Sequence, residues 1–329
     1  MNILVVDVAA VEGGALTILK LFRDRLSEDK DNHYFFCVSR AEISDTDNIT
    51  VLTFPWAKKS WFHRLWFDYH VCRGLLRQYG IEKIISLQNT AVPRVAVPQM
   101  IYLHQPLPFV EYRFRLTENP RLWCYQNIIS RLILSSLKRA DSITVQTHWM
   151  KKAVIERAGI SEDRITVEPP PVELKAGARF SQSEWKGELF YPASNIPYKN
   201  HILLFKALAY LKEKKTPVPT LFLTLTEEQL PGDCAALYPS LKEHIVLLGS
   251  LPREEVLRQY GKSALVFPSY IETYGLPLLE AKNAGCPILA SDCAFSHEIL
   301  SDYPQARFFD PFSTAGLADA IESIEVELH

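Results

Sequence analysis

Two glutamates in the stretch PSYIETYGLPLLEA (residues 268–281) have the types and spacing to do chemistry. Glu272 lies in a polar loop after the apolar run ALVFPS, and Glu280 follows after seven intervening residues. Proline near the start of the next segment and Gly285 at its end predict a helix that begins between the two carboxylates. Free amides at a helix N-terminus bind phosphate. We therefore expect two carboxylates around a phosphate site; for either glutamate alone, the alternative is a surface or capping charge.

A lysine follows an earlier apolar run in the same half of the chain. In YPASNIPYKNH (191–201), Lys199 lies near the start of a predicted helix beside Asn200. A cation at such a turn can neutralise a diphosphate leaving group. The alternative is a solvated lysine.

Two further candidates lie near the beginning of the chain. Gly13 and Gly14 open a predicted helix, so backbone N–H groups can approach an anion or a sugar hydroxyl. They form neither a G-x-G-x-x-G pattern nor a P-loop. His104 directly follows the run QMIYL, and a neutral imidazole there suits a sugar hydroxyl. The alternatives are a plain glycine turn and a structural histidine.

The elements that position these residues are short apolar runs that alternate with amphipathic stretches. Continuous apolar strands separated by helical patterns predict parallel sheets covered on both faces. The runs expected to be strands are 2–8, 34–38, 49–54, 83–87, 99–103, 142–146, 165–168, 188–192, 220–225, 244–249, 264–269 and 287–291. Helices are expected over 15–28 and 126–140.

The chain divides at the proline-rich stretch that begins VEPPP, because three prolines continue neither a helix nor a central strand. We predict an α/β protein of two doubly wound, Rossmann-like domains, 1–170 and 187–329, joined by a linker over 171–186. Ligands of open α/β sheets bind beyond the carboxyl ends of the strands, so the site residues are expected directly after strands, in a central cleft.

Composition excludes several classes of protein. The chain has 329 residues, 47% of them hydrophobic, and no apolar run approaches the length of a membrane-spanning helix. The start MNILVVDVAA has no basic segment before it, so it predicts a strand rather than a signal peptide. Residues 1–179 carry 24 Lys+Arg against 19 Asp+Glu, whereas the remainder carries 12 against 19. The two halves are thus expected to meet different partners.

At the two glutamates the sequence resembles the family-4 glycosyltransferases, retaining, nucleotide-sugar-dependent enzymes of the GT-B fold. Their pattern is PS-x-x-E-x-(F/Y)-G-x-P-x-x-E-A-x-x-x-G-x-P, which PSYIETYGLPLLEAKNAGCP matches nearly throughout. The likeness extends over most of the chain, including 143–160, 246–269 and 308–324. The resemblance implies that the N-terminal domain lies on the acceptor side and the C-terminal domain binds the nucleotide sugar.

The resemblance also implies roles for the residues. Glu280 would hold the ribose, Glu272 would contact the donor sugar, and Lys199 would neutralise the diphosphate. His104 would hydrogen-bond the donor sugar. The other donor-binding positions are Gly13, Gly14, Ser194, Asn200, Ser250, Leu251, Tyr274, Gly275 and Leu276.

The sequence departs from the family pattern at two places. Ala193 and Ser194 stand where a second diphosphate-binding cation, an arginine, is usual, so Lys199, helix amides or Asn200 would have to compensate. The sequence ends at AIESIEVELH, so the helix that usually crosses back to the N-terminal domain is expected to be short, missing or truncated.

No cofactor or metal is expected, because the nucleotide sugar is a substrate. The sequence Asp45-Thr46-Asp47 matches the D-x-D of metal-dependent glycosyltransferases of another fold, but it lies in a polar loop and is interpreted as a solvated turn. The six cysteines are scattered without a C-x-x-C pair, which favours a reducing cytoplasm.

Basic residues alternate with large aromatics over 56–80 and 112–123. This pattern suits an anionic membrane surface, and the alternative is that the aromatics belong to the core. Nucleic acid is not expected as a partner, because the positive charge is small and no binding motif is present.

We therefore predict a cytoplasmic, peripheral enzyme at the inner face of the cytoplasmic membrane. It would move a sugar from a UDP- or GDP-sugar to a lipid-linked or cell-surface saccharide. The alternatives are a sugar-nucleotide epimerase and a degenerate nucleotide-sugar-binding protein.

Overall fold

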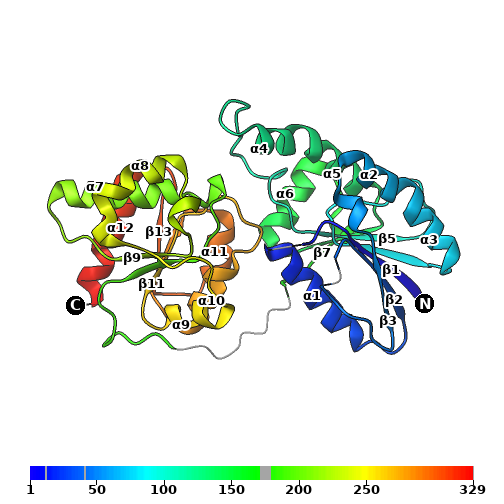
Figure 1. Cartoon of the computed structure of the whole chain (residues 1–329), viewed down its shortest axis with the longest axis horizontal. Coiled ribbons are helices and arrows are strands. Elements are labelled where there is room, and N and C mark those ends of the chain that lie inside the picture. Colours follow the sequence, from blue (N-terminus) through cyan, green and yellow to red (C-terminus); the bar gives the residue numbers. More distant parts are fainter. Residues whose placement is uncertain (12, 41, 171–178, 329) are drawn as a thin grey trace. The chain divides into compact units, whose positions relative to one another are not determined.

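The computed structural model describes residues 1–11, 13–40, 42–170 and 179–328. The chain forms two compact units, Met1–Val172 and Glu173–His329. Each unit contains its own parallel sheet with helices packed against it (Figure 1). The predicted class of two doubly wound α/β domains is therefore confirmed.

The sheet of the first unit has seven strands in the order β3-β2-β1-β4-β5-β6-β7. They are β1 (Asn2–Asp7), β2 (His33–Val38), β3 (Ile49–Thr53), β4 (Lys83–Ser86), β5 (Gln99–Leu103), β6 (Ser142–Val145) and β7 (Ile165–Val167). All pairs are parallel; in β1, for example, Ile3 lies opposite Tyr34 of β2 and Lys83 of β4. Every strand expected in this half is present, within two residues of its predicted ends.

Side chains of β1 alternate between two layers of helices. Ile3 and Val5 pack with residues of α1, and Leu4 and Val6 pack on the other face with a cluster that contains Phe67. Figure 1 shows α1 on the opposite side of this sheet from α2 and α3. The helices of this unit are α1 (Gly13–Ser27), η1 (Pro55–Lys58), α2 (Trp61–Trp66), η2 (Phe67–Val71), α3 (Cys72–Gln78), α4 (Pro120–Cys124), η3 (Tyr125–Ile129), α5 (Ser130–Arg139), α6 (His148–Ala158) and η4 (Glu162–Arg164).

Two of these segments, η2 and η3, are single turns of π-helix inside longer helical stretches. The N–H of Cys72 donates to the carbonyl of Phe67, and that of Ser130 to the carbonyl of Tyr125, each five residues back. The hydroxyl of Ser130 also donates to the Tyr125 carbonyl at 2.9 Å. Single π turns within α-helices occur frequently at functional sites.

The sheet of the second unit has six parallel strands in the order β10-β9-β8-β11-β12-β13. They are β8 (Leu189–Tyr191), β9 (Leu221–Leu223), β10 (Ile245–Leu247), β11 (Ala264–Phe267), β12 (Ile288–Ser291) and β13 (Ala306–Phe309). The sequence reading missed β13. It is an edge strand in which only Phe309 is buried, so it lacks the apolar run that marked the others.

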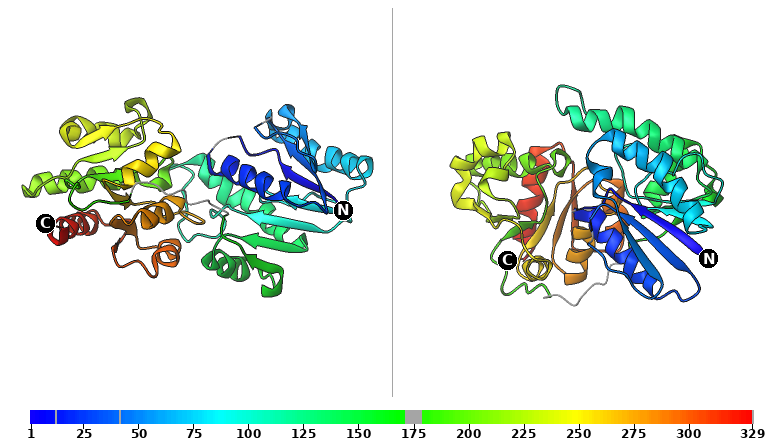
Figure 2. Two further views of the ribbon diagram at one scale, coloured as in Figure 1. Left: turned by 90° about the horizontal axis from the view of Figure 1, so that it is seen from below. Right: turned by 45° about the vertical axis from the view of Figure 1, so that its right-hand side comes forward.

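Crossovers between parallel strands are right-handed as a rule, so the strand order of the second unit predicts helices on both faces of its sheet. Helix α7 packs against α8 and α12, while α10 packs against α9 and α11. The helix α12, red in Figures 1 and 2, lies along α7. The helices of this unit are η5 (Pro197–Lys199), α7 (His201–Lys214), η6 (Glu227–Gln229), α8 (Gly232–Leu241), η7 (Lys242–His244), α9 (Arg253–Tyr260), α10 (Leu276–Ala284), α11 (Ala294–Leu300) and α12 (Thr314–Leu328).

The predicted linker, 171–186, is described in part. Residues 171–178 lie outside the described residues. The N–H of Phe180 donates to the carbonyl of Ala284 at 2.8 Å, and Trp185 is buried. This last part of the predicted linker is therefore packed on the second unit.

Asp7, at the end of β1, is a buried carboxyl whose ionisation opposes folding. Its Oδ1 accepts from the N–H of Ala10 at 3.2 Å, while its Oδ2 has no hydrogen-bond partner among the described residues. Burial raises the pKa of Asp7 to about 7, although the amide of Ala10 and the charge of Arg64 act in the opposite direction. An unfolded aspartate keeps a pKa near 4, so between these values the folded chain holds a proton that the unfolded chain has lost. Stability therefore falls as pH rises through this window.

The substitution Asp7→Asn is expected to remove this cost. The free energy of unfolding, relative to the unmodified protein, should rise by about 2–3 kcal/mol more at pH 8 than at pH 5, as the difference in pKa requires. Denaturant unfolding at the two pH values measures it, with the exposed Asp31→Asn as control. Equal increments at both pH values would show that Asp7 is ionised throughout.

Candidate functional site

The strand order of the second unit reverses between β8 and β11, and the predicted donor-site residues follow these two strands. The loop after β8 carries Ser194, Lys199 and Asn200, and the segment after β11 carries Glu272 through Glu280. Loops that leave adjacent strands in opposite directions open a crevice at the sheet edge, where ligands of such folds bind. Residues distant in sequence are thus brought to one edge of this sheet.

Lys199 and Glu272 form an ion pair across this reversal point. The Lys199 Nζ contacts Glu272 Oε1, and both side chains are largely buried. The hydroxyl of Ser269 donates to the same carboxylate oxygen at 2.8 Å. The amide of Tyr270 donates to the carbonyl of Tyr198 at 3.2 Å, which joins the two loops through their backbones. The structure therefore brings together a cation and a carboxylate that the sequence separates by 72 residues.

Asn200 braces the loop that carries Lys199. Its backbone adopts φ +60°, a left-handed conformation that asparagine tolerates better than most residues. Its side-chain nitrogen donates to the carbonyls of Pro268, at 3.3 Å, and Pro311, at 2.8 Å. The hydroxyl of Tyr191 donates to the carbonyl of Lys199 at 2.8 Å. These bonds fix the loop and occupy the amide of Asn200, whereas Ser194 in the same loop is exposed.

The turn between the two glutamates depends on Gly275. Its φ is +80°, and it caps the start of α10, where Leu276 and Pro277 form the first turn. A Cβ at this position would lie 3.1 Å from Leu278 Cδ1. The turn presents the first amides of α10 at the carboxyl edge of β11, as the phosphate-site prediction requires. Tyr274 precedes this turn and is partly buried.

Glu280 is buried in α10 with two partners. Arg253 Nη2 lies 2.8 Å from Glu280 Oε1, and the hydroxyl of Tyr260 donates to Oε2 at 3.4 Å. Burial raises the pKa of Glu280, and the guanidinium of Arg253 opposes that change. Both partners belong to α9, at its first and last residues. A buried carboxylate with a single cation is a fixed acceptor for hydroxyl groups.

Arg253 was not singled out in the sequence. It follows Ser250 and Leu251, two of the predicted donor-binding residues, and it begins the helix after β10. Arg253 is partly exposed, so its guanidinium joins a solvent-facing surface to the buried Glu280. The sequence could have pointed to Arg253 only through its position, two residues after Leu251 and shortly after a predicted strand.

In the first unit, the predicted residues also follow strands. Gly13 and Gly14 begin α1 after β1, and His104 follows β5. The backbone N–H of His104 donates to Asn89 Oδ1 at 2.8 Å, and its ring bonds to the backbone of Leu87. Burial lowers the pKa of His104 to about 4. The imidazole is thus neutral at physiological pH, with one ring nitrogen that donates and one that accepts.

A cavity of about 420 Å³ opens at the carboxyl edge of the same sheet. It lies among the ends of β1 and β4 and the two helical stretches that contain η2 and η3. Polar side chains that line it include Lys58, Arg64, Asp68, Gln88 and Tyr125. The resemblance implied that this domain lies on the acceptor side. The cavity itself could not be predicted from the sequence, because its walls come from four separate segments.

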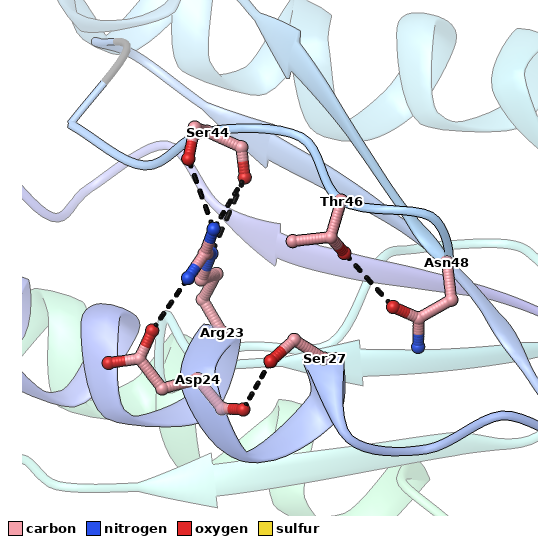
Figure 3. Close-up of polar contacts among 6 residues, drawn as sticks. All are labelled: Arg23, Asp24, Ser27, Ser44, Thr46 and Asn48. Carbon is pink, nitrogen blue, oxygen red and sulfur yellow. Dashed lines mark hydrogen bonds and ion pairs between the residues drawn. The ribbon is translucent and has the colours of Figure 1, made fainter.

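The Asp45-Thr46-Asp47 sequence forms part of a braced surface turn. Asp45 Oδ1 accepts from the N–H of Val51 at 2.7 Å. Figure 3 shows Arg23 of α1 bonded to Ser44, and Thr46 bonded to Asn48. Among the described residues, no three His, Cys, Asp or Glu side chains are grouped to hold a metal. In the same residues, no helix is both long and apolar enough to cross a bilayer.

Two family models match the chain. The model "Glycosyltransferase Family 4" covers residues 12–176, and "Glycosyl transferases group 1" covers residues 180–327. The boundary between the matches falls at the boundary between the two structural units.

Curated relatives are distant. The O-antigen chain mannosyltransferase RfbU of Salmonella typhimurium is 22% identical over 79% of this chain and 69% of its own length. The D-inositol 3-phosphate glycosyltransferase of Nocardia farcinica is 27% identical over 57% of this chain and 46% of its own. The chain thus spans less than half of the second relative.

Solved structures share the fold over nearly the whole chain. A sucrose-phosphate synthase from Thermosynechococcus elongatus has a TM-score of 0.73 at 15% identity, covering 99% of this chain and 90% of its own. HepE of Anabaena, solved with UDP-glucose, has a TM-score of 0.70 at 15% identity over 100% and 91%. WaaG, a glycosyltransferase involved in lipopolysaccharide biosynthesis, has a TM-score of 0.69 at 14% identity over 100% and 92%.

The substitution Gly275→Ala is expected to destabilise the second unit. A left-handed alanine costs about 1–2 kcal/mol, and the contact with Leu278 adds to that cost. Gly285→Ala is a matched control, because its φ is +77° and its Cβ would meet no atom within 4 Å. Denaturant unfolding should show a larger loss for Gly275→Ala; equal losses would show that the Leu278 contact is relieved.

The substitution Glu280→Gln is expected to weaken nucleotide binding while leaving the fold intact. Loss of a charged acceptor for hydroxyl groups corresponds to about ten- to a hundredfold in the dissociation constant. Calorimetric titration with UDP and GDP measures it, and Glu254→Gln, at an exposed position of α9, is the control. If Glu280→Gln bound every nucleotide as tightly as the unmodified protein does, Glu280 would not belong to the nucleotide site.

Proposed function

This chain belongs to the family-4 glycosyltransferases, and we propose that it transfers a sugar, with retention of anomeric configuration, from a nucleotide sugar to a saccharide acceptor. The family matches and the parallel sheets of seven and six strands support this assignment. The fold class is GT-B, as its solved structural neighbours are. We propose a UDP- or GDP-sugar as donor and a lipid-linked or cell-surface saccharide as acceptor.

The observation that carries the proposal is the contact of Lys199 with Glu272 at the strand reversal. A diphosphate that arrives at the first turn of α10 brings negative charge next to this pair. Lys199 then has two anionic partners, and its charge offsets the charge that develops on the leaving diphosphate. Glu272 lies at the strand end, where it meets the transferred sugar.

The proposed reaction places acceptor and leaving group on one face of the sugar. The bond from the anomeric carbon to the diphosphate oxygen breaks as the bond to the acceptor oxygen forms. The acceptor hydroxyl gives its proton to the departing diphosphate oxygen. In this scheme the side chains position the reactants and stabilise charge, and neither glutamate forms a covalent intermediate.

Lys199 acts without the arginine that is usual nearby. Ala193 is buried and Ser194 is exposed at the corresponding positions. Asn200 donates to two backbone carbonyls, so its contribution is to hold Lys199 in place. We propose that the amides of α10 supply the remaining stabilisation and that the reaction requires no metal.

The relatives support the acceptor class. Two of them are O-antigen chain mannosyltransferases, and a structural neighbour acts in lipopolysaccharide biosynthesis. We propose that the enzyme works at the cytoplasmic face of the membrane, which it contacts through the first unit. There, Trp61, Phe62 and Trp66 are exposed beside basic residues of the same segment.

The test combines donor binding with transfer. Thermal stabilisation by a panel of nucleotide sugars identifies the donor, because a ligand that binds the folded state raises the melting temperature. Glu272→Gln and Lys199→Met are expected to lower transfer about a hundredfold or more while the protein stays folded. The exposed Lys206→Met and Glu254→Gln are controls.

Four outcomes would contradict all or part of the proposal. Full transfer by Glu272→Gln would remove that residue from the site, and nucleotide binding without turnover across acceptors would indicate a binding protein. An inverted anomeric configuration in the product, measured by NMR, would exclude the retaining reaction. Epimerisation of the donor without acceptor would favour an epimerase.

A further inference from the structure

The cavity of the first unit combines a polar floor with apolar walls. Its floor contains a chain of contacts: Arg64 Nε donates to Asp68 Oδ2 at 3.0 Å, and Gln88 Nε2 donates to Asp68 Oδ1 at 3.2 Å. Gln88 is buried, and its Oε1 has no hydrogen-bond partner among the described residues. A buried amide oxygen without a donor is costly, so a small turn of this side chain that brought Oε1 to a ligand hydroxyl would be favourable.

The charged residues that line the cavity favour an anion. Three are cationic (Lys58, Arg64 and Arg139) and one, Asp68, is acidic. Lys58 Nζ donates to the carbonyl of Ala9 at 3.0 Å, which holds this ammonium beside the end of β1. Arg139 is exposed at the end of α5. Because Arg64 is already paired with Asp68, the surplus positive charge comes from Lys58 and Arg139.

The walls of the cavity are apolar and open to solvent. Trp61 and Leu65, of α2, and Leu132, of α5, line it and expose 60%, 44% and 49% of their surface. Phe62 and Trp66, at neighbouring positions of α2, expose 83% and 58%. Large apolar side chains grouped at a cavity mouth mark a binding surface rather than ordinary surface scatter.

The floor is connected to the loop of His104. Gln88 lines the cavity, and the preceding residue, Leu87, bonds through its backbone to the imidazole. Tyr125, of η3, also lines the cavity and bonds to the side chain of Gln105, next to His104. A group bound on the floor therefore lies beside the histidine that the family pattern assigns to the sugar.

We propose that this cavity binds the head of a lipid-linked acceptor. Its phosphate lies near Lys58 and Arg139, its sugar hydroxyls lie toward Gln88, and its hydrocarbon chain leaves across Trp61, Leu65 and Leu132. The volume, about 420 Å³, is that of a small-molecule site and suits the head rather than the chain. The inference rests on the proposed function, to which it adds the acceptor site and the choice of a lipid-linked acceptor over a lipid-free one.

Binding of a polyprenyl phosphate tests this proposal without any transfer reaction. The unmodified protein is titrated with polyprenyl phosphate in phosphatidylcholine nanodiscs. A first parallel titration uses nanodiscs in which phosphatidylglycerol replaces the polyprenyl phosphate at the same surface charge. A second uses a soluble sugar phosphate without a lipid chain. We expect tight binding only to the polyprenyl phosphate, because it supplies both the anion and the chain.

Variants of the wall and rim locate the binding. Leu132→Glu and Arg139→Glu are each expected to weaken polyprenyl phosphate binding about tenfold or more, the equivalent of one lost contact. Leu116→Glu is the matched control, because Leu116 exposes 53% of its surface and does not line the cavity. Circular dichroism confirms that each variant is folded, and nucleotide titration confirms that its donor site is intact.

Three outcomes would overturn the inference. The first is binding to phosphatidylglycerol nanodiscs as tight as binding to polyprenyl phosphate, which would indicate a general membrane surface. The second is equally tight binding of the lipid-free sugar phosphate. The third is unchanged affinity for polyprenyl phosphate in both Leu132→Glu and Arg139→Glu. Each can occur while nucleotide binding and transfer to another acceptor are intact, in which case the proposed function stands. Conversely, if the protein had no transferase activity but still bound polyprenyl phosphate through this cavity, the lipid site would stand and the proposed transferase function would be wrong.

Discussion

The contact between Lys199 and Glu272 is the interaction on which the geometry of the second unit depends. Two loops from adjacent strands must approach closely enough for an ammonium and a carboxylate to meet, and several hydrogen bonds hold the loops together. Asn200 ties the first loop to the carbonyls of Pro268 and Pro311, and Ser269 orients the carboxylate. The same strand reversal places Gly275 and the start of α10 at this edge. The ion pair therefore sits between two loops that are themselves held in place by hydrogen bonds.

Much of this arrangement could be predicted from the sequence, because apolar runs and glycine or proline boundaries mark buried parallel strands and helix ends. That information places Lys199, Glu272 and Glu280 after β8 and β11. It fails for β13, whose single buried residue, Phe309, gives no periodic signal. The π turns η2 and η3 were also missed, because their composition does not distinguish them from the α-helices around them.

Contacts between side chains distant in sequence could not be predicted. Arg253 and Tyr260 meet Glu280 because α9 packs against α10, a fact that no local pattern contains. The cavity of the first unit likewise requires segments from four places in the chain. Sequence reasoning found the aromatic and basic composition of one of these segments but left open whether its aromatics were core. The structure divides them: Phe67 is buried, while Trp61, Phe62 and Trp66 are exposed.

The paired π turns have a consequence for how such a protein changes over evolutionary time. A π turn holds one residue more than the α-helical turn it replaces, so it accommodates an insertion without shifting the helix on either side. In this chain, Phe67 and Cys72 remain in the core, while Asp68 and Tyr69, between them, line the cavity. A single residue gained or lost at η2 or η3 would therefore change the part of the cavity wall that the turn itself forms, while the helices on either side keep their packing on the sheet. In the function proposed above, small length changes at these turns would alter the acceptor cavity without touching the second unit.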